Sequence, residues 1–156
     1  GHNLRSAFIQ GYNLVVFHCK NSRWEKLVQS ETTKEKIDIW WETDDNSSRL
    51  MLLFAYLMTK TDHWNGAEIR VITIDSPNFF EARGHLAEFF NEVRIPAEPI
   101  VVDNMAPETI IEYSKEADLV FLPYKIQNSQ LTDRARERLD RVLPQLSAIE
   151  LFIKAE

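Results

Sequence analysis

Short apolar runs recur along the chain and predict six strands. Several runs are continuous in Val, Ile and Leu rather than alternating with polar residues, as expected of parallel strands that are covered on both faces. The predicted strands are 13–19, 37–41, 68–74, 98–102, 118–124 and 148–153. The first of these strands can run parallel to the others or lie as an antiparallel edge.

Helical patterns separate the strands from the second strand onward. The predicted helices are 49–59, 78–93, 107–117 and 132–142. Ser47 or Ser48 is the expected N-cap of the first helix, because a serine hydroxyl can accept a hydrogen bond from the first turn. Alternating strands and helices predict an α/β fold: an open, mainly parallel sheet of five to six strands with helices on both faces.

Two neighbouring segments have more apolar side chains than a strand and a helix can bury against one face of a sheet. Consecutive strand residues point to opposite faces, so Trp40 and Trp41 require cover on both sides of the sheet. Residues 50–58 are apolar on every side of the predicted helix, so some of them cannot face the sheet. The cover can come from neighbouring helices, from a second copy, or from a missing part of a larger protein. The residues predicted for packing or for an interface are Trp40, Trp41, Leu50, Leu53, Phe54 and Leu57.

Composition and charge narrow the class of protein. The chain has 156 residues, of which 44% are hydrophobic and 27% charged, which is typical of one globular domain. A net charge of −6 argues against a nucleic acid partner. Residues 1–36 nevertheless hold six basic and three acidic side chains. This basic beginning is compatible with an anionic membrane surface or with an ordinary solvated segment.

The single cysteine indicates a reducing compartment. The first two residues indicate a domain that was cut from a larger protein. Cys19 has no partner for a disulfide within the chain. No apolar run approaches the ~20 residues that a membrane-spanning helix needs. Gly1 and His2 resemble a tag remnant, so we expect residues 3–156 to form a single domain cut from a larger membrane protein.

Polar residues follow the carboxyl ends of the predicted strands, where open α/β sheets bind ligands. The candidates for binding an adenine nucleotide or another anion are Asp44, Asp45, Asp75, Asp103 and Lys125. Asp44 and Asp45 are equally suited to the start of a helix, where negative charge is favoured. None of the four glycines opens a helix after a strand, and no histidine, cysteine or serine pattern is typical of a metal or catalytic site. We therefore expect no catalytic residue, no metal and no cofactor.

Several motifs together resemble one transporter family. The pattern IDIWW-x-x-DD, the apolar LMLLFAYLM helix, Trp64 and EIRVITI are similar to the cytosolic C-terminal domain of cation–chloride cotransporters. They also resemble that domain in bacterial amino acid permease-like transporters of the same superfamily. ADLVFLP and LPQLSAIELFI resemble later strands of the family.

This resemblance implies a non-catalytic regulatory domain at the cytoplasmic face of the cell membrane, with a fold like that of universal stress proteins. Its implied partners are its own transmembrane transport domain and a second copy. Paired glycines of the family are replaced here by Asn46, Ser47 and Ser48, so a nucleotide ligand is not carried over from the resemblance.

Overall fold

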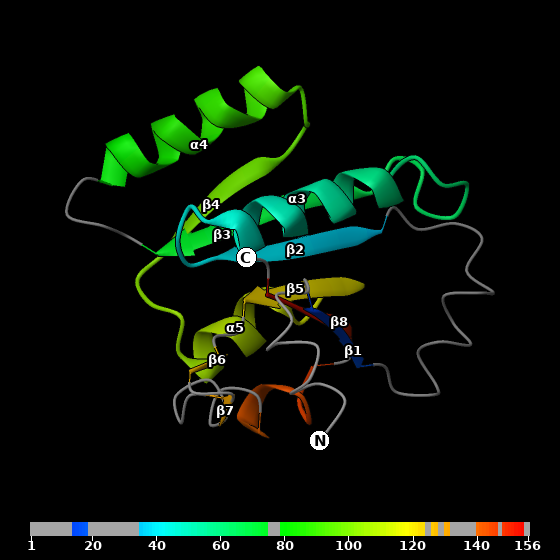
Figure 1. Ribbon diagram of the computed structural model, residues 1–156, viewed down its shortest axis with the longest axis vertical. Coiled ribbons are helices and arrows are strands. Elements are labelled where there is room, and N and C mark those ends of the chain that lie inside the picture. Colours follow the sequence, from blue (N-terminus) through cyan, green and yellow to red (C-terminus); the bar gives the residue numbers. More distant parts are fainter. Residues whose placement is uncertain are drawn as a thin grey trace.

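Six strands form a single sheet in the order β1-β8-β5-β2-β3-β4 (Figure 1). The computed structural model describes residues 14–18, 35–74, 79–123, 126–127, 130–131, 140–146 and 148–154. The strands of the sheet are β1 (Leu14–His18), β2 (Lys36–Trp41), β3 (Glu68–Ile74), β4 (Glu98–Val102), β5 (Leu119–Pro123) and β8 (Ile149–Lys154).

The sheet is mainly parallel. The neighbours β5, β2, β3 and β4 form a parallel run, and β8 extends it by pairing parallel with β5. β1 pairs antiparallel with β8 at the edge, which settles the orientation of the first strand. The prediction of an α/β fold with a mainly parallel sheet is confirmed. A separate short hairpin, β6 (Ile126–Gln127) with β7 (Gln130–Leu131), was not predicted.

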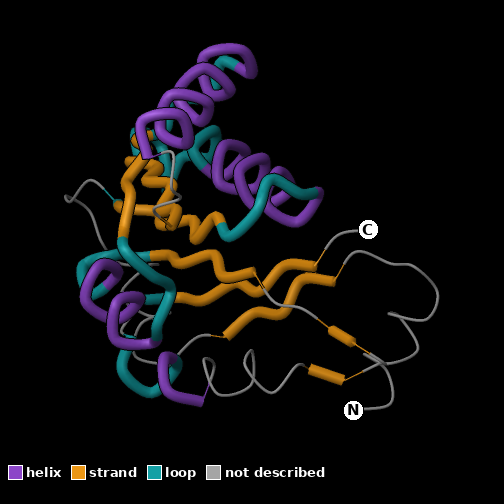
Figure 2. Tube along the Cα trace, turned by 90° about the vertical axis from the view of Figure 1, so that its left-hand side faces the viewer, coloured by secondary structure: helices purple, strands orange, loops and turns teal. Residues whose placement is uncertain are grey.

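Helices cover both faces of the sheet, as the two views show (Figure 2). The helices are α3 (Asn46–Met58), α4 (Phe79–Val93) and α5 (Pro107–Ser114), followed by a last helical turn at residues 140–142. α3 and α4 lie on one face, and α5 and the last turn lie on the other. The third predicted helix ends earlier than expected, in a turn where Ala117 N–H donates to the Ser114 carbonyl. Most of the fourth, residues 132–139, lies outside the described residues. No helix in the described part of the chain is long and apolar enough to cross a membrane.

α3 begins earlier than predicted and has a different N-cap residue. Asp45, rather than Ser47 or Ser48, is the N-cap: its backbone is extended and its carboxylate accepts the Ser48 N–H at 2.9 Å. Ser48 is buried one turn later, and its hydroxyl donates to the Thr43 carbonyl at 2.6 Å. The helix therefore begins three residues earlier than predicted, because the acidic residue before the serines provides the cap.

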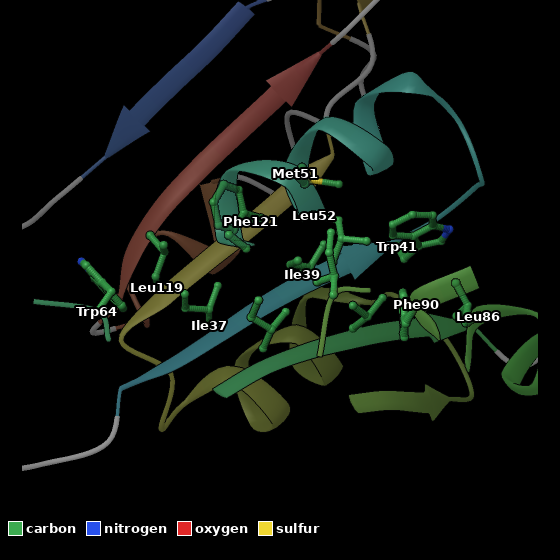
Figure 3. Close-up of a cluster of buried hydrophobic side chains, with 14 residues drawn as sticks. Ile37, Ile39, Trp41, Met51, Leu52, Trp64, Leu86, Phe90, Leu119 and Phe121 are labelled. Atoms are coloured by element: carbon green, nitrogen blue, oxygen red, sulfur yellow. The ribbon is translucent and has the colours of Figure 1, made fainter. Parts of the chain in front are cut away.

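Two apolar clusters, one on each face of the sheet, form the core. The first lies under α3 and α4 and includes Trp41, Met51 and Phe90 (Figure 3). The second lies under α5 and the last turn and includes Trp40 and Ile110. The adjacent tryptophans thus enter opposite clusters, as the strand periodicity predicted.

Candidate interaction surface

α3 has two stripes of side chains, an inner stripe that is apolar except for one serine and an outer stripe that is entirely apolar. Its inner stripe, Ser48, Met51, Leu52 and Ala55, is buried against the sheet. Its outer stripe follows the same spacing two residues later, at Leu50, Leu53, Phe54 and Leu57. Leu53, Phe54 and Leu57 are 46%, 36% and 51% exposed, and Leu50 is half-buried. Because each residue turns a helix by about 100°, a shift of two residues places the stripes on nearly opposite sides.

The outer stripe is concentrated rather than scattered. Among the described residues, the other large exposed apolar side chains are Val15, Val93 and Tyr113, each on a different element. Single exposed apolar residues are ordinary on a protein surface, whereas three neighbours on one helix form a patch. The patch on α3 is therefore the strongest candidate for an interaction surface in the described part of the chain.

Cationic side chains lie at the two ends of this surface. Arg49, near the start of α3, places its guanidinium 5.7 Å from the Phe89 ring centroid, and so contacts α4. Lys60 follows the end of α3 and places its ammonium 4.4 Å from the Tyr56 ring centroid. Such cation–π contacts hold each charge beside the apolar stripe without removing it from water.

Trp40 and Trp41 are both buried within this chain. Trp40 is fully buried and Trp41 nearly so. Trp40 Nε1–H donates to Ser114 Oγ at 3.0 Å, which ties β2 to the last turn of α5. Of the six residues predicted for packing or an interface, the two tryptophans therefore lie in the core, and the outer stripe of α3 contains the other four.

A buried ion pair, which the sequence analysis missed, lies on the α5 side of the sheet. Arg70 donates two hydrogen bonds to the Asp38 carboxylate, at 2.7 and 2.8 Å, and a third to the Tyr113 carbonyl at 3.1 Å. Ser114 Oγ donates to Asp38 at 2.7 Å. Burial raises the pKa of Asp38, and this effect exceeds the lowering by the hydrogen bonds from Arg70 and Ser114.

One signal for this pair was present in the sequence. Asp38 is the only acid within the apolar strand IDIWW, and Arg70 is the only base within EIRVITI. Asp38 and Arg70 are direct neighbours in the parallel register of β2 and β3. The network fixes α5 on the sheet and is buried, so it contributes to the fold rather than to a surface site.

The predicted ligand-binding residues are only partly brought together. Asp44 is paired with Arg49 through two hydrogen bonds of 2.9 Å, which lower the pKa of Asp44. Asp45 is occupied as the cap of α3 and also accepts a hydrogen bond from Thr43. Asp103 is exposed after β4. Asp75 and Lys125 lie outside the described residues. No group of His, Cys, Asp and Glu in the described ranges could hold a metal ion.

The fold defines a class: an α/β domain whose fold is similar to that of universal stress proteins. A universal stress protein from Archaeoglobus fulgidus DSM 4304 superposes with a TM-score of 0.62 at 10% sequence identity. The match covers 93% of this chain and 50% of that chain, so this chain spans half the length of that protein. At this identity the likeness concerns the fold alone.

The family follows from the sequence match. The family model for solute carrier family 12 matches residues 17–150. The chain belongs to solute carrier family 12, the cation–chloride cotransporter family. This confirms the resemblance that the IDIWW and LMLLFAYLM motifs indicated. A search of curated proteins returned no match.

Proposed function

We propose that residues 3–156 form the non-catalytic regulatory and dimerisation domain of a secondary membrane transporter. The parent would be a cation–chloride cotransporter or an amino acid permease-like relative, and this domain would lie at the cytoplasmic face of the cell membrane. Membership of solute carrier family 12 supports the transporter parent. The partners would be its own transport domain and a second copy, with the basic first 36 residues nearest the lipid surface.

The outer stripe of α3 is the observation that carries this proposal. The inner stripe attaches α3 to the first cluster together with Leu50, Tyr56 and Met58. Leu53, Phe54 and Leu57 are not part of that cluster. Fully burying one such side chain is worth roughly 1.5–3 kcal/mol. A partner that covers Leu53, Phe54 and Leu57 would therefore gain several kilocalories per mole.

The surface is small for a stand-alone complex. A stable interface usually buries about 800 Å² on each partner, more than one exposed helix stripe offers. Two domains tethered beneath neighbouring transport domains, however, meet at a high effective concentration. A weak contact would then be sufficient to fix the relative position of the two transport domains, and it could be broken and re-formed by a signal.

The acidic residues near α3 support a non-catalytic role. Asp44 is held by Arg49 and Asp45 by the first turn of α3, so both serve the local fold. Asp38 is enclosed between Arg70 and Ser114. Each of these acids has a structural partner in the chain, and the proposal assigns catalysis to none of them.

The full-length parent provides the test. Its reading frame should encode about ten to twelve apolar spans of ~20 residues before Asn3. In that parent, Leu53→Asp should lower the dimer fraction and alter transport, because a charge cannot be buried in an apolar contact. Val93→Asp is the matched control, since it adds the same charge at an exposed apolar residue on α4. A parent without membrane spans would overturn the proposal.

A second candidate function is a sensor that binds an adenine nucleotide or another anion, in the manner of a small α/β ligand-binding domain. It is supported by the fold and by Asp103, which is exposed at the carboxyl edge of the sheet. Calorimetry with ATP, ADP, AMP and phosphate tests it. Heat that disappears in Asp103→Ala would support the sensor, and the absence of heat at millimolar ligand would remove it.

A further inference from the structure

The turn between α3 and β3 contains the only Asn-Gly pair in the sequence, at Asn65 and Gly66. The Ala67 N–H donates to the Trp64 carbonyl at 3.0 Å and closes a four-residue turn around this pair. Gly66 has a φ of +84°, which the third position of a type II turn requires and which glycine adopts without strain. Asn65 and Gly66 are both exposed, and nothing lies within 4 Å of the position that a Cβ of Gly66 would take. Water therefore reaches both residues.

We propose that Asn65 is a site of spontaneous deamidation, which converts this turn into an isoaspartyl linkage. Hydroxide removes the proton of the Gly66 N–H, and the nitrogen attacks the Asn65 Cγ. The new N–C bond closes a succinimide ring, and the side-chain nitrogen leaves as ammonia with a proton from water. Water then opens the ring at either carbonyl, which gives aspartate or isoaspartate. The reaction needs no enzyme, oxidant or reductant, and the inference does not depend on the proposed function.

Two features favour this reaction at Asn65 over Asn104, which is also exposed. Gly66 has no Cβ, so no side chain crowds its nitrogen during the attack, whereas Asn104 is followed by a methionine. Within the described ranges no hydrogen bond fixes the Asn65 amide, so the amide can turn toward the backbone. Asn104 Oδ1 instead accepts hydrogen bonds from the Ala106 N–H and the Thr109 hydroxyl, both at 2.8 Å. Asn65 should therefore be the more reactive of the two.

The closed turn slows the reaction without preventing it. In a type II turn, the peptide between the second and third residues directs the Gly66 nitrogen away from the Asn65 side chain. Ring closure needs this peptide to rotate, and the hydrogen bond from Ala67 to Trp64 opposes the rotation. Exposed turns open locally at a small cost in free energy. The reaction in the folded chain should therefore proceed from the open turn and be slower than in the unfolded chain.

Isoaspartate would change how the chain enters β3. Its main chain passes through the former side-chain methylene, so one atom is added between Trp64 and Gly66. Trp64 is 8% exposed in the first cluster, and Ala67 packs against the same cluster. The next N–H, of Glu68, donates to the Glu35 carbonyl at 2.9 Å, where β2 and β3 begin to pair. A turn with an added atom no longer fits between these fixed ends, so the modified chain should be less stable.

Peptide mapping by mass spectrometry of the aged chain tests the site. At mildly alkaline pH, the folded chain should convert Asn65 before Asn91 and Asn104, and the rate should rise with hydroxide concentration. The urea-unfolded chain should convert Asn65 faster, because its turn is open. The proposal would be overturned if Asn104 reacted as fast as Asn65 in the folded chain. It would also be overturned if the folded chain kept Asn65 intact while the unfolded chain converted it.

Two variants separate the reaction from its effect on the fold. Asn65→Gln keeps the amide but needs a larger ring, so this chain should gain no acidic form at the rate of the wild type. An equal rate in Asn65→Gln would contradict the assignment to Asn65. Asn65→Asp adds the negative charge without the added main-chain atom. The isoaspartyl chain, isolated by chromatography, should unfold at a lower urea concentration than Asn65→Asp, and equal midpoints would overturn the predicted effect on the turn.

Discussion

α3 and α5 lie on opposite faces of the same sheet, and each buries one side in the core. They differ on the side that faces away from the sheet. α5 has Glu108, Glu112 and Tyr113 exposed there, and its buried side is fixed by hydrogen bonds among Ser114, Asp38 and Trp40. α3 has Leu53, Phe54 and Leu57 exposed instead. Since both helices are already attached by their inner sides, the apolar outer side of α3 points to a role beyond folding.

The stability of the fold and the association of copies should depend on different residues. On α5, the residues that matter should be those that hold the helix to the sheet. On α3, the inner and outer stripes should behave differently, because changes in the first affect unfolding and changes in the second affect association.

The largest expected effect is on the inner stripe of α3. Leu52 is almost fully buried among the side chains of the first cluster. Leu52→Ala removes this apolar contact and leaves a cavity, so it should lower the free energy of unfolding by about 2–5 kcal/mol. Leu53→Ala, one position along, should change it by less than about 0.5 kcal/mol. Urea unfolding followed by tryptophan fluorescence measures both, and equal losses would contradict the division into two stripes.

The next largest effect on stability is expected from the hydrogen-bond network on the α5 side of the sheet. Asp38→Asn replaces one carboxylate oxygen with an NH2 group, which cannot accept the hydrogen bonds that Arg70 and Ser114 donate to Asp38. A buried donor left without its acceptor should cost about 1–3 kcal/mol of stability. The control is Asp44→Asn, which breaks an exposed ion pair and should cost less than about 1 kcal/mol. If the two variants were equally stable, the network between β2, β3 and α5 would not be what fixes α5.

A smaller effect is the dependence of stability on pH, which has opposite signs for Asp38 and Asp44. The raised pKa of Asp38 means that the folded state holds this proton more tightly than the unfolded state. Its contribution to stability is present below the unfolded pKa of about 4 and is lost as pH rises through the raised folded pKa. For Asp44, whose pKa is lowered, the contribution is present above about pH 4 and is lost as pH falls through the folded pKa.

Unfolding of the wild type and of the two Asn variants between about pH 3 and pH 7 tests this contrast. On acidification, the wild type should gain stability relative to Asp38→Asn and lose it relative to Asp44→Asn. A difference of the same sign for both variants would contradict it.

Local signals in the sequence predicted the strands well and the polar contacts poorly. β3 and β4 begin and end as predicted, because β3 alternates apolar with polar residues, β4 is rich in apolar residues, and turn residues follow both. The predicted start of α3 was wrong, since the choice of N-cap among Asp45, Ser47 and Ser48 depends on which side chain reaches the first-turn N–H. β6 and β7 have only two residues each and leave no periodic pattern.

The site depends on tertiary arrangement, which the sequence indicates only in part. An all-apolar helix showed that some of its side chains must face away from the sheet. Which ones do so depends on the rotation of α3, and this rotation is set by Met51, Leu52 and Ala55 packing on the sheet. The pairing of Asp38 with Arg70 depends on β2 and β3 being neighbours, which strand order alone decides.

The most direct test of the central claim, that the outer side of α3 is a contact between copies, is light scattering over a series of chain concentrations. Because the surface is small, the wild type should shift from monomer to dimer only as the concentration approaches the roughly millimolar level that a short tether provides. Leu53→Asp and Phe54→Asp should stay monomeric without loss of folding, and Val93→Asp should behave as the wild type. A wild type that is monomeric throughout, or a dimer that persists in both α3 variants, would contradict the account.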